Sequence, residues 1–467
     1  MRLKGHNRFI YLGLILLFLV GLMIPIYLRF SRVKLGDREI HCNPRARINP
    51  RKEYHIRLWD YDRPILTSRD GYRRYLEEAI AAFRKQYPGV HVEVRLLEAS
   101  TGPKELRQAL ENHTAPDLYC SAWEIPSFDW DCQIPVGFFL KDTEQELYYP
   151  GLLNLVRLYG VVCYFPYWTA PRFWIGNRRL LEKAGFNIGL LQQSGWSMSE
   201  LLVAVKRAGP GRYLLVGDSG SNGFLTQLSV NSMKGLEQYR PKVTDIREAL
   251  GFLDTLRDQK ALPEDFDTRM LEYFLNGKAM VLAGANLSLY GWVKNYLRDR
   301  QSNVTPSDGS EPNSSKDNRD GLTQWDPVLL PVPHQTDAAA RLLAENGVIA
   351  VYRSKFTIGD DQIAVAVKLG QFLSTYRQTR PWQELLVCPA AMANTEYWAA
   401  GTGLTPSDLR LIDQSLRHTS LLNLNFSPIR AQEFDRVIRE YYLRKINLEI
   451  AESRLAQLMN EPGAISF

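Results

Sequence analysis

Cysteine and histidine are scarce in this chain of 467 residues, and neither occurs in a metal-binding pattern. The five cysteines, Cys42, Cys120, Cys132, Cys163 and Cys388, include no CxxC pair, and the seven histidines include no HExxH. Their odd number excludes a complete disulfide framework. Cys120 and Cys132 could pair with each other, or both could be buried free thiols. Phosphate-loop and GxGxxG patterns are also absent, so we expect no metal and no cofactor.

A basic surplus is missing from most of the chain, although the net charge is +6. Residues 1–52 hold eleven Lys or Arg and two acidic residues, whereas the remaining chain holds 46 basic and 49 acidic residues. A nucleic-acid-binding domain would carry its basic patch on the folded part, so we expect no nucleic-acid partner. The basic collar at the N-terminus is suited to anionic lipid headgroups.

Long uncharged runs are rare, and the clearest is residues 9–28, twenty residues without a charge. This length can cross a bilayer. No small-residue cleavage site follows it, and Cys42 lies too far from it for a lipoprotein. We therefore predict an uncleaved transmembrane anchor in residues 1–30, followed by a basic tether in residues 31–52. Charges on both flanks leave the orientation open, but a large domain can be translocated regardless of them. We expect a single-pass protein of the cell membrane with its large domain outside the cytoplasm.

About 415 residues follow the anchor, more than one hydrophobic core normally holds, so two lobes are expected. Alternating apolar residues predict strands at 54–58 and 90–96, and a one-sided apolar pattern predicts a helix over 70–87 between them. A short helix at 104–111 and a strand at 116–119 follow. This βαβαβ order favours a mostly parallel sheet covered by helices, an α/β fold.

The second half of the chain repeats this alternation. Ser197 with Glu200 three residues later has the spacing of a capping box and predicts a helix start. Residues 299–321 are almost free of apolar side chains and are predicted to be a disordered insertion. The other elements predicted from the residues are a strand at 172–175 and helices at 244–260, 361–376 and 431–459.

Several loose motifs occur in a consistent order. They are the aromatic Pro-Tyr segment at 164–167, Asn177 to Gly185 (NRRLLEKAG), the helix start after Trp196, and Phe274 to Gly284 (FLNGKAMVLAG). Their order over residues 54–455 resembles the family 1 extracellular solute-binding proteins, which are maltose-binding-protein-like partners of bacterial ABC importers. The resemblance implies two lobes of a periplasmic-binding-protein-like fold, with further strands at 280–283, 325–333 and 345–350. Lobe 1 would comprise residues 53–167 and about 350–395, and lobe 2 residues 168–349 and about 396–467. It also implies a monomer that does not catalyse a reaction, closes by a hinge on a carbohydrate and delivers it to ABC permease subunits.

A sugar site needs flat aromatic faces together with carboxylates and amides, and ligands of open α/β sheets settle at strand ends. Residues of these types follow several predicted strands. In many relatives of the resembled family a stacking Trp stands where this chain has Asn286, and Trp292 is a nearby aromatic that could replace it. The candidate ligand-binding residues are Trp59, Asp60, Ser121, Trp123, Glu124, Trp168, Thr169, Asp218, Asn222, Asn286 and Trp292. Trp174, inside a strand, is predicted to belong to the core instead.

Two other functions remain open from the sequence. A protein of the same fold could be a ligand sensor whose closed form is read by a membrane histidine kinase. A secreted hydrolase could act through paired carboxylates such as Asp60 and Glu124. Binding of an oligosaccharide without its turnover would separate the hydrolase from the other two functions, and neighbouring permease genes would favour transport over sensing.

Overall fold

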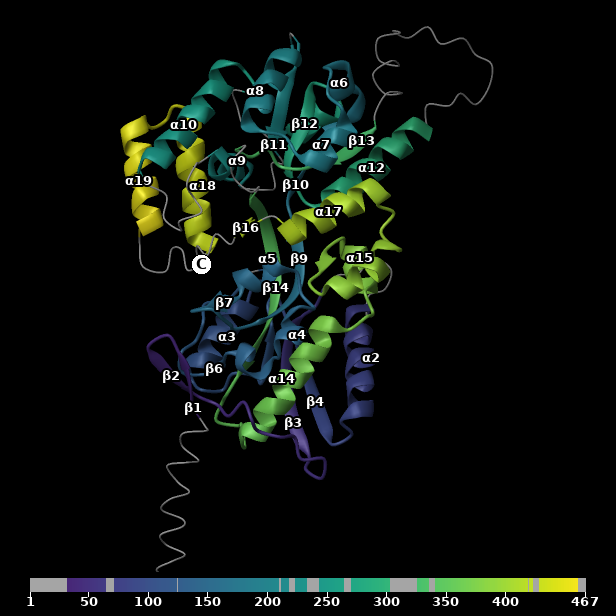
Figure 1. The fold of residues 1–467 in the computed structure, drawn as a ribbon, viewed down its shortest axis with the longest axis vertical. Coiled ribbons are helices and arrows are strands. Elements are labelled where there is room, and N and C mark those ends of the chain that lie inside the picture. The colour runs from purple at the N-terminus through teal and green to yellow at the C-terminus, as the bar shows by residue number, and fades with distance from the viewer. Residues whose placement is uncertain are drawn as a thin grey trace, which may run out of the picture.

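The computed structural model describes residues 32–63, 71–123, 125–209, 211–217, 223–232, 243–263, 270–302, 326–335, 341–418, 420–422 and 428–460. These residues form two lobes, each built on its own sheet (Figure 1). Two strands, β9 (Phe165–Pro171) and β14 (Arg341–Tyr352), run between the lobes. They pair with each other in antiparallel register, which makes them the structural link between the two halves.

Lobe 1 contains an eight-stranded sheet whose main path is β15-β9-β14-β5-β3-β4. Strand β3 is parallel to β4 and β5, whereas β14 is antiparallel to β5 and β9. The predicted mostly parallel sheet is therefore wrong, and the sheet is mixed, because β14 enters it from the side of the other lobe. The remaining strands are β3 (Tyr54–Tyr61), β4 (Val90–Leu97), β5 (Leu118–Cys120), β6 (Gln133–Ile134), β15 (Cys388–Pro389) and β16 (Ser420–Leu422), of which β6 and β16 pair with β14.

Helix α2 (Gly71–Gln86) covers part of this sheet through one apolar face. Tyr72, Tyr75, Leu76, Ala79, Ile80 and Phe83 are its buried side chains, the same six that share one face in the sequence pattern. Helix α14 (Asp360–Thr375) packs beside it across β3, β9 and β14. The shorter elements of this half are α3 (Gly102–Glu111), η1 (Val136–Phe139), α4 (Asp142–Gln145), α5 (Pro150–Leu155), β7 (Arg157–Leu158) and β8 (Val161–Val162).

Lobe 2 is built on the sheet β11-β12-β10-β13, which is also mixed because only β11 and β12 are parallel. Ser197 caps its helix as predicted: its hydroxyl accepts from the Glu200 amide, and the Glu200 carboxylate accepts from the Ser197 amide at 2.7 Å. Trp174 is fully buried, which confirms its place in the core. The elements are β10 (Phe173–Asn177), α6 (Arg178–Lys183), α7 (Ile188–Ser194), α8 (Met198–Arg207), β11 (Tyr213–Gly217), α9 (Phe224–Ser232), α10 (Val243–Asp258), α11 (Met270–Leu275), β12 (Ala279–Ala285), α12 (Leu287–Ser302) and β13 (Pro327–Leu330).

The C-terminal part of the chain contributes to both lobes. Helices α18 (Pro428–Tyr442) and α19 (Leu448–Asn460) pack on α9 and α10 of lobe 2. Between the lobes lie α15 (Arg380–Leu385), η3 (Met392–Asn394), α16 (Thr395–Ala399) and α17 (Pro406–His418).

Helix α12 continues to Ser302, so residues 299–302 of the predicted insertion are helical, and residues 303–325 lie outside the described part.

The segment after the predicted anchor is folded rather than extended as a tether. Strands β1 (Arg32–Leu35) and β2 (Arg38–His41) form an antiparallel hairpin. Leu35 and Cys42 are fully buried in the core, so apolar burial fixes this segment to the domain. The predicted span at residues 9–28 lies outside the described residues, and no helix among those described is long and apolar enough to cross a bilayer. All five cysteines are buried and free, which confirms the free-thiol alternative for Cys120 and Cys132.

Candidate ligand-binding site

A buried ion pair lies where β3 ends. Asp60 is fully buried, and Arg63, three residues later, is almost so. One guanidinium nitrogen of Arg63 donates to Asp60 Oδ1 at 3.3 Å and to the Ser121 carbonyl at 3.0 Å. The Tyr72 hydroxyl donates to Asp60 Oδ2 at 2.7 Å. Burial raises the pKa of Asp60 above its usual value, while Arg63 and Tyr72 oppose that rise. The pair thus places a cation and a carboxylate at the edge of lobe 1 that faces lobe 2.

Aromatic rings surround the Arg63 guanidinium. Its carbon lies 5.3 Å from the ring centre of Trp168, 5.5 Å from that of Tyr72 and 5.7 Å from that of Trp382. Trp168 and Trp382 are stacked with centroids 6.5 Å apart. These contacts join α2, β9 and α15, which are far apart in the sequence. Cation–π attraction in a desolvated site stabilises such a charge.

Trp123 extends this aromatic group to the surface. Its ring meets Trp168 edge to face, with centroids 5.2 Å apart, yet 48% of Trp123 is exposed. Trp168 itself is buried and fits only because position 347 is glycine: a Cβ on Gly347 would lie 2.0 Å from the indole nitrogen. The exposed Trp123 ring therefore packs on the buried Trp168 ring, which holds it in place. This arrangement is suited to stacking a ligand.

Two buried donors of this group are left without acceptors. Arg63 Nε and Trp168 Nε1 have no hydrogen-bond partner among the residues that the structure describes. Buried N–H groups normally find a partner in protein, water or ligand. A hydroxyl-bearing ligand or an ordered water can supply the missing acceptor.

Neighbouring strand ends are tied together by polar side chains. The Ser121 hydroxyl accepts from the Val348 amide at 3.0 Å, and the Ser121 amide donates to the Val348 carbonyl at 2.8 Å. The Thr169 hydroxyl donates to Asn346 Oδ1 at 2.8 Å. Both residues therefore join β14 to its neighbours and fix the position of the aromatic group. Their polar atoms are already engaged within the protein.

The side toward lobe 2 is organised differently. Arg172, just past β9, pairs with Glu345 of β14 and donates to the Gly284 carbonyl at 3.4 Å. Asn286 Oδ1 accepts from the Leu289 amide at 2.9 Å and so caps the start of α12. Trp292 lies on that helix and stacks on Tyr296 with centroids 5.0 Å apart. A helix cap and an aromatic pair, of which Trp292 is exposed, therefore occupy this side in place of a buried ion pair.

The structure brings together only part of the predicted set. Asp60, Ser121, Trp123 and Trp168 gather around Arg63, with Thr169 adjacent in β9. Trp59 lies under the guanidinium of Arg95 on β4, because neighbouring strand residues face opposite ways. Asn286 and Trp292 belong to α12. Glu124, Asp218 and Asn222 lie outside the described residues.

Three residues of the site were missed from the sequence. Arg63 follows Asp60 by three residues, and that spacing next to a strand end was an available signal. The sequence pattern placed Tyr72 on the apolar face of its helix, but nothing in that pattern showed that its hydroxyl would bind Asp60. Trp382 comes from α15, more than 300 residues along the chain from Asp60, and no local pattern links the two.

A separate cavity of about 340 Å³ lies at α12 and β13. Its polar lining includes Lys294, Arg298, Asp326 and Thr402, and no aromatic side chain contributes to it. None of the predicted binding residues lines this cavity. It lacks the flat apolar faces that a sugar ring needs, so we assign the candidate site to the Arg63 group.

No protein-family model and no curated protein sequence matches this chain. Solved structures do match it. The sugar-binding protein MalE from Xanthomonas citri is 17% identical, with a TM-score of 0.62 over 87% of this chain and 96% of that one. The cyclic alpha-maltosyl-1,6-maltose binding protein from Arthrobacter globiformis is 13% identical, with a TM-score of 0.57 over 87% and 98%. An ABC substrate-binding protein from Listeria monocytogenes, in complex with cycloalternan, is 14% identical, with a TM-score of 0.54 over 88% and 98%. The chain therefore has the two-lobed α/β fold of these solute-binding proteins, as predicted.

Proposed function

We propose that this protein captures a carbohydrate, an oligosaccharide or sugar derivative, between its two lobes and delivers it to an ABC permease. The observation that carries this proposal is the Trp123–Trp168 pair at the lobe boundary. Trp123 offers a half-exposed ring of the kind that stacks on the apolar face of a sugar. The similar structures include proteins described as binding sugars, which supports the same ligand class here.

Polar groups beside Trp123 would recognise the hydroxyls of the sugar. Arg63 Nε is a buried donor without a protein acceptor in the described part of the chain. Glu124 follows Trp123 directly in sequence. From lobe 2 we propose Asp218 and Asn222, which follow β11, and also Trp292. A wrong sugar would leave some of these groups unpaired, which costs affinity and so gives specificity.

Closure of the lobes would complete the site. Strands β9 and β14 connect the lobes beside Trp168, so a rotation about them changes the distance from lobe 2 to Trp123. Hinge closure around a ligand is an established mode of two-lobed binding proteins. The protein is proposed to act as a monomer, held on the outer side of the cell membrane by the span at residues 9–28.

A hydrolytic role is disfavoured by the state of Asp60. A catalytic carboxylate must be able to reach the scissile bond, as acid, base or nucleophile. Asp60 is fully buried and bonded to Arg63, Tyr72 and its neighbouring amide. We therefore give it a positioning role in a binding protein.

The ligand can be found by thermal-shift screening of oligosaccharides, because a ligand that binds only the folded state raises the melting temperature. Calorimetric titration of the identified sugar is then compared between the parent and Trp123→Ala. We expect a loss of about 2 kcal/mol of binding free energy, the size typical of a central aromatic contact. Tyr397→Ala is a matched control, since Tyr397 is 50% exposed on α16. Equal affinity of the parent and Trp123→Ala would contradict the proposed site.

A further inference from the structure

The loop between β14 and α14 exposes two large apolar side chains at the end of lobe 1. Phe356 is 50% exposed and Ile358 is 79% exposed, the highest fraction among the exposed large hydrophobic residues of the described chain. This loop leads into α14, which begins at the lower end of the lobe in Figure 1. An exposed apolar tip of this kind indicates a contact surface.

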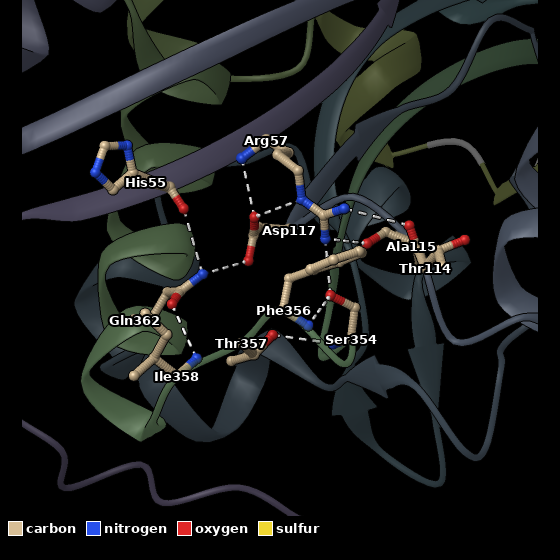
Figure 2. A network of polar contacts seen from close by, with 10 residues as sticks. All are labelled: His55, Arg57, Thr114, Ala115, Asp117, Ser354, Phe356, Thr357, Ile358 and Gln362. Atoms are coloured by element: carbon tan, nitrogen blue, oxygen red, sulfur yellow. Dashed lines mark hydrogen bonds and ion pairs between the residues drawn. The ribbon is translucent and has the colours of Figure 1, made fainter.

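Hydrogen bonds hold this loop in shape (Figure 2). Ser354 Oγ accepts from Arg57 at 2.8 Å and from the Phe356 amide at 3.3 Å. The Ile358 amide donates to Gln362 Oε1 at 3.0 Å, and Gln362 Nε2 donates in turn to buried Asp117 at 2.9 Å. The two apolar side chains therefore project from a braced loop, so their exposure is built into the fold.

Two cationic groups lie over the Phe356 ring. The Arg57 guanidinium lies 4.3 Å from the Phe356 ring centre, and the Lys355 ammonium lies 5.3 Å from it. Residues 43–52 add four basic side chains and no acidic one. This segment is attached beside the loop, because Lys52 pairs with Asp361 of α14 at 2.7 Å. Exposed apolar side chains with basic side chains beside them match the interface of an anionic bilayer.

The chain itself brings this end of the lobe to a membrane. The apolar run ends at Leu28 and the described structure begins at Arg32. Four residues span at most about 14 Å when fully extended. If residues 9–28 cross the bilayer, the start of β1 must lie close to its surface. Figure 1 shows β1 on the same end of lobe 1 as the start of α14.

We propose that residues 354–358, together with the basic segment 43–52, form a membrane-contact surface. In this arrangement Phe356 and Ile358 enter the interface of an anionic bilayer, and the basic side chains face its phosphates. The inference rests on the N-terminal span of the proposed function. Lobe 1 would then be fixed at its base, at the end where β3 begins, and lobe 2 would be the moving lobe.

The test uses the full-length chain in lipid nanodiscs, with an environment-sensitive fluorophore on Ile358→Cys. The label is selective because all five native cysteines are buried, and burial raises the pKa of Cys42 and of Cys163 to about 12. Leu190→Cys is the matched control, since Leu190 is 57% exposed on α7 of lobe 2. Nanodiscs of phosphatidylcholine mixed with phosphatidylglycerol are compared with phosphatidylcholine alone.

We expect the label at position 358 to shift to shorter wavelength, to lose most of its emission to nitroxide-bearing lipids, and to resist iodide in anionic nanodiscs. The label at position 190 should show no shift to shorter wavelength, keep its emission beside nitroxide-bearing lipids, and remain accessible to iodide. Equal access of iodide to both positions would overturn the contact surface. So would protection from iodide without quenching by lipid, because protein would then cover the loop. Extraction of the unlabelled chain from membranes by alkaline carbonate would instead refute the anchor on which the inference rests.

Discussion

The facing edges of the two lobes differ in how much of their polar chemistry is buried. In lobe 1, Asp60 and Arg63 form a buried ion pair enclosed by aromatic rings. In lobe 2, β12 ends in small buried residues, and the polar group that follows, Asn286, caps α12. The difference indicates that lobe 1 carries a site formed before ligand arrives, whereas lobe 2 adds its contacts on closure. The predictions below compare the two lobes directly.

The largest effect is expected from removing one partner of the buried pair. Asp60→Ala leaves the Arg63 charge buried without its carboxylate, which should lower the free energy of unfolding by about 3–5 kcal/mol. The lobe 2 pair of Arg178 and Asp326 is partly exposed, so Asp326→Ala should cost at most about 1 kcal/mol. Urea unfolding of both variants measures the contrast. Similar losses for the two variants would mean that Arg63 finds solvent or another partner, and that the lobes do not differ in this way.

A smaller effect is expected at Gly347. An added Cβ would meet the Trp168 indole, so Gly347→Ala should destabilise the protein by about 1–3 kcal/mol and weaken ligand binding. Gly251→Ala is the matched control in lobe 2, where nothing lies within 4 Å of the added atom. That change lies within α10 and should leave stability unchanged or raise it by up to about 1 kcal/mol. Calorimetric melting and sugar titration of both variants provide the measurement. An unchanged Gly347→Ala protein would show that Trp168 is not tightly held.

The role of Asn286 can be separated in the same way. If its side chain only caps α12, Asn286→Ala should lower stability by about 1 kcal/mol and leave the affinity for sugar unchanged. Asn286→Ser, which keeps a capping oxygen, should restore most of the stability. A loss of affinity in both variants would place Asn286 in the binding site and reduce the difference between the lobes.

The smallest effect concerns the attachment of the N-terminal segment to lobe 1. Partial burial favours the protonated form of Asp361, but hydrogen bonds from Lys52 and Tyr54 outweigh it and lower its pKa below the usual value. The stabilisation is therefore present above the usual carboxyl pKa near about 4 and is lost as pH falls through the lowered folded-state pKa. At pH 7, Asp361→Asn should cost up to about 1 kcal/mol, and the difference from the parent should vanish in acid.

Urea unfolding at a series of pH values measures this difference. Glu452 of lobe 2 provides the comparison, because a hydrogen bond from Arg247 lowers its pKa in the same direction. A destabilisation by Asp361→Asn that persists at low pH would show that packing, rather than the ion pair, holds residues 43–52.

Much of the architecture follows from local patterns. The face of α2, the capping box at Ser197 and the buried position of Trp174 were all predicted, because each depends on residues close together in sequence. The relative directions of the strands were predicted wrongly. A βαβαβ pattern fixes β3, β4 and β5 but cannot show that β14, more than 200 residues later, enters among them from the other lobe.

The candidate site divides in the same way. The sequence by itself determined that polar and aromatic residues follow the strands, and it identified Asp60, Trp123 and Trp168 among them. Only the tertiary structure decided that Arg63 is buried against Asp60 and that Trp382 closes over it. Periodicity reports which face of an element is apolar, because that is a property of neighbouring residues. Desolvation of a charge depends on every element that surrounds it, and those elements meet only when the chain has folded.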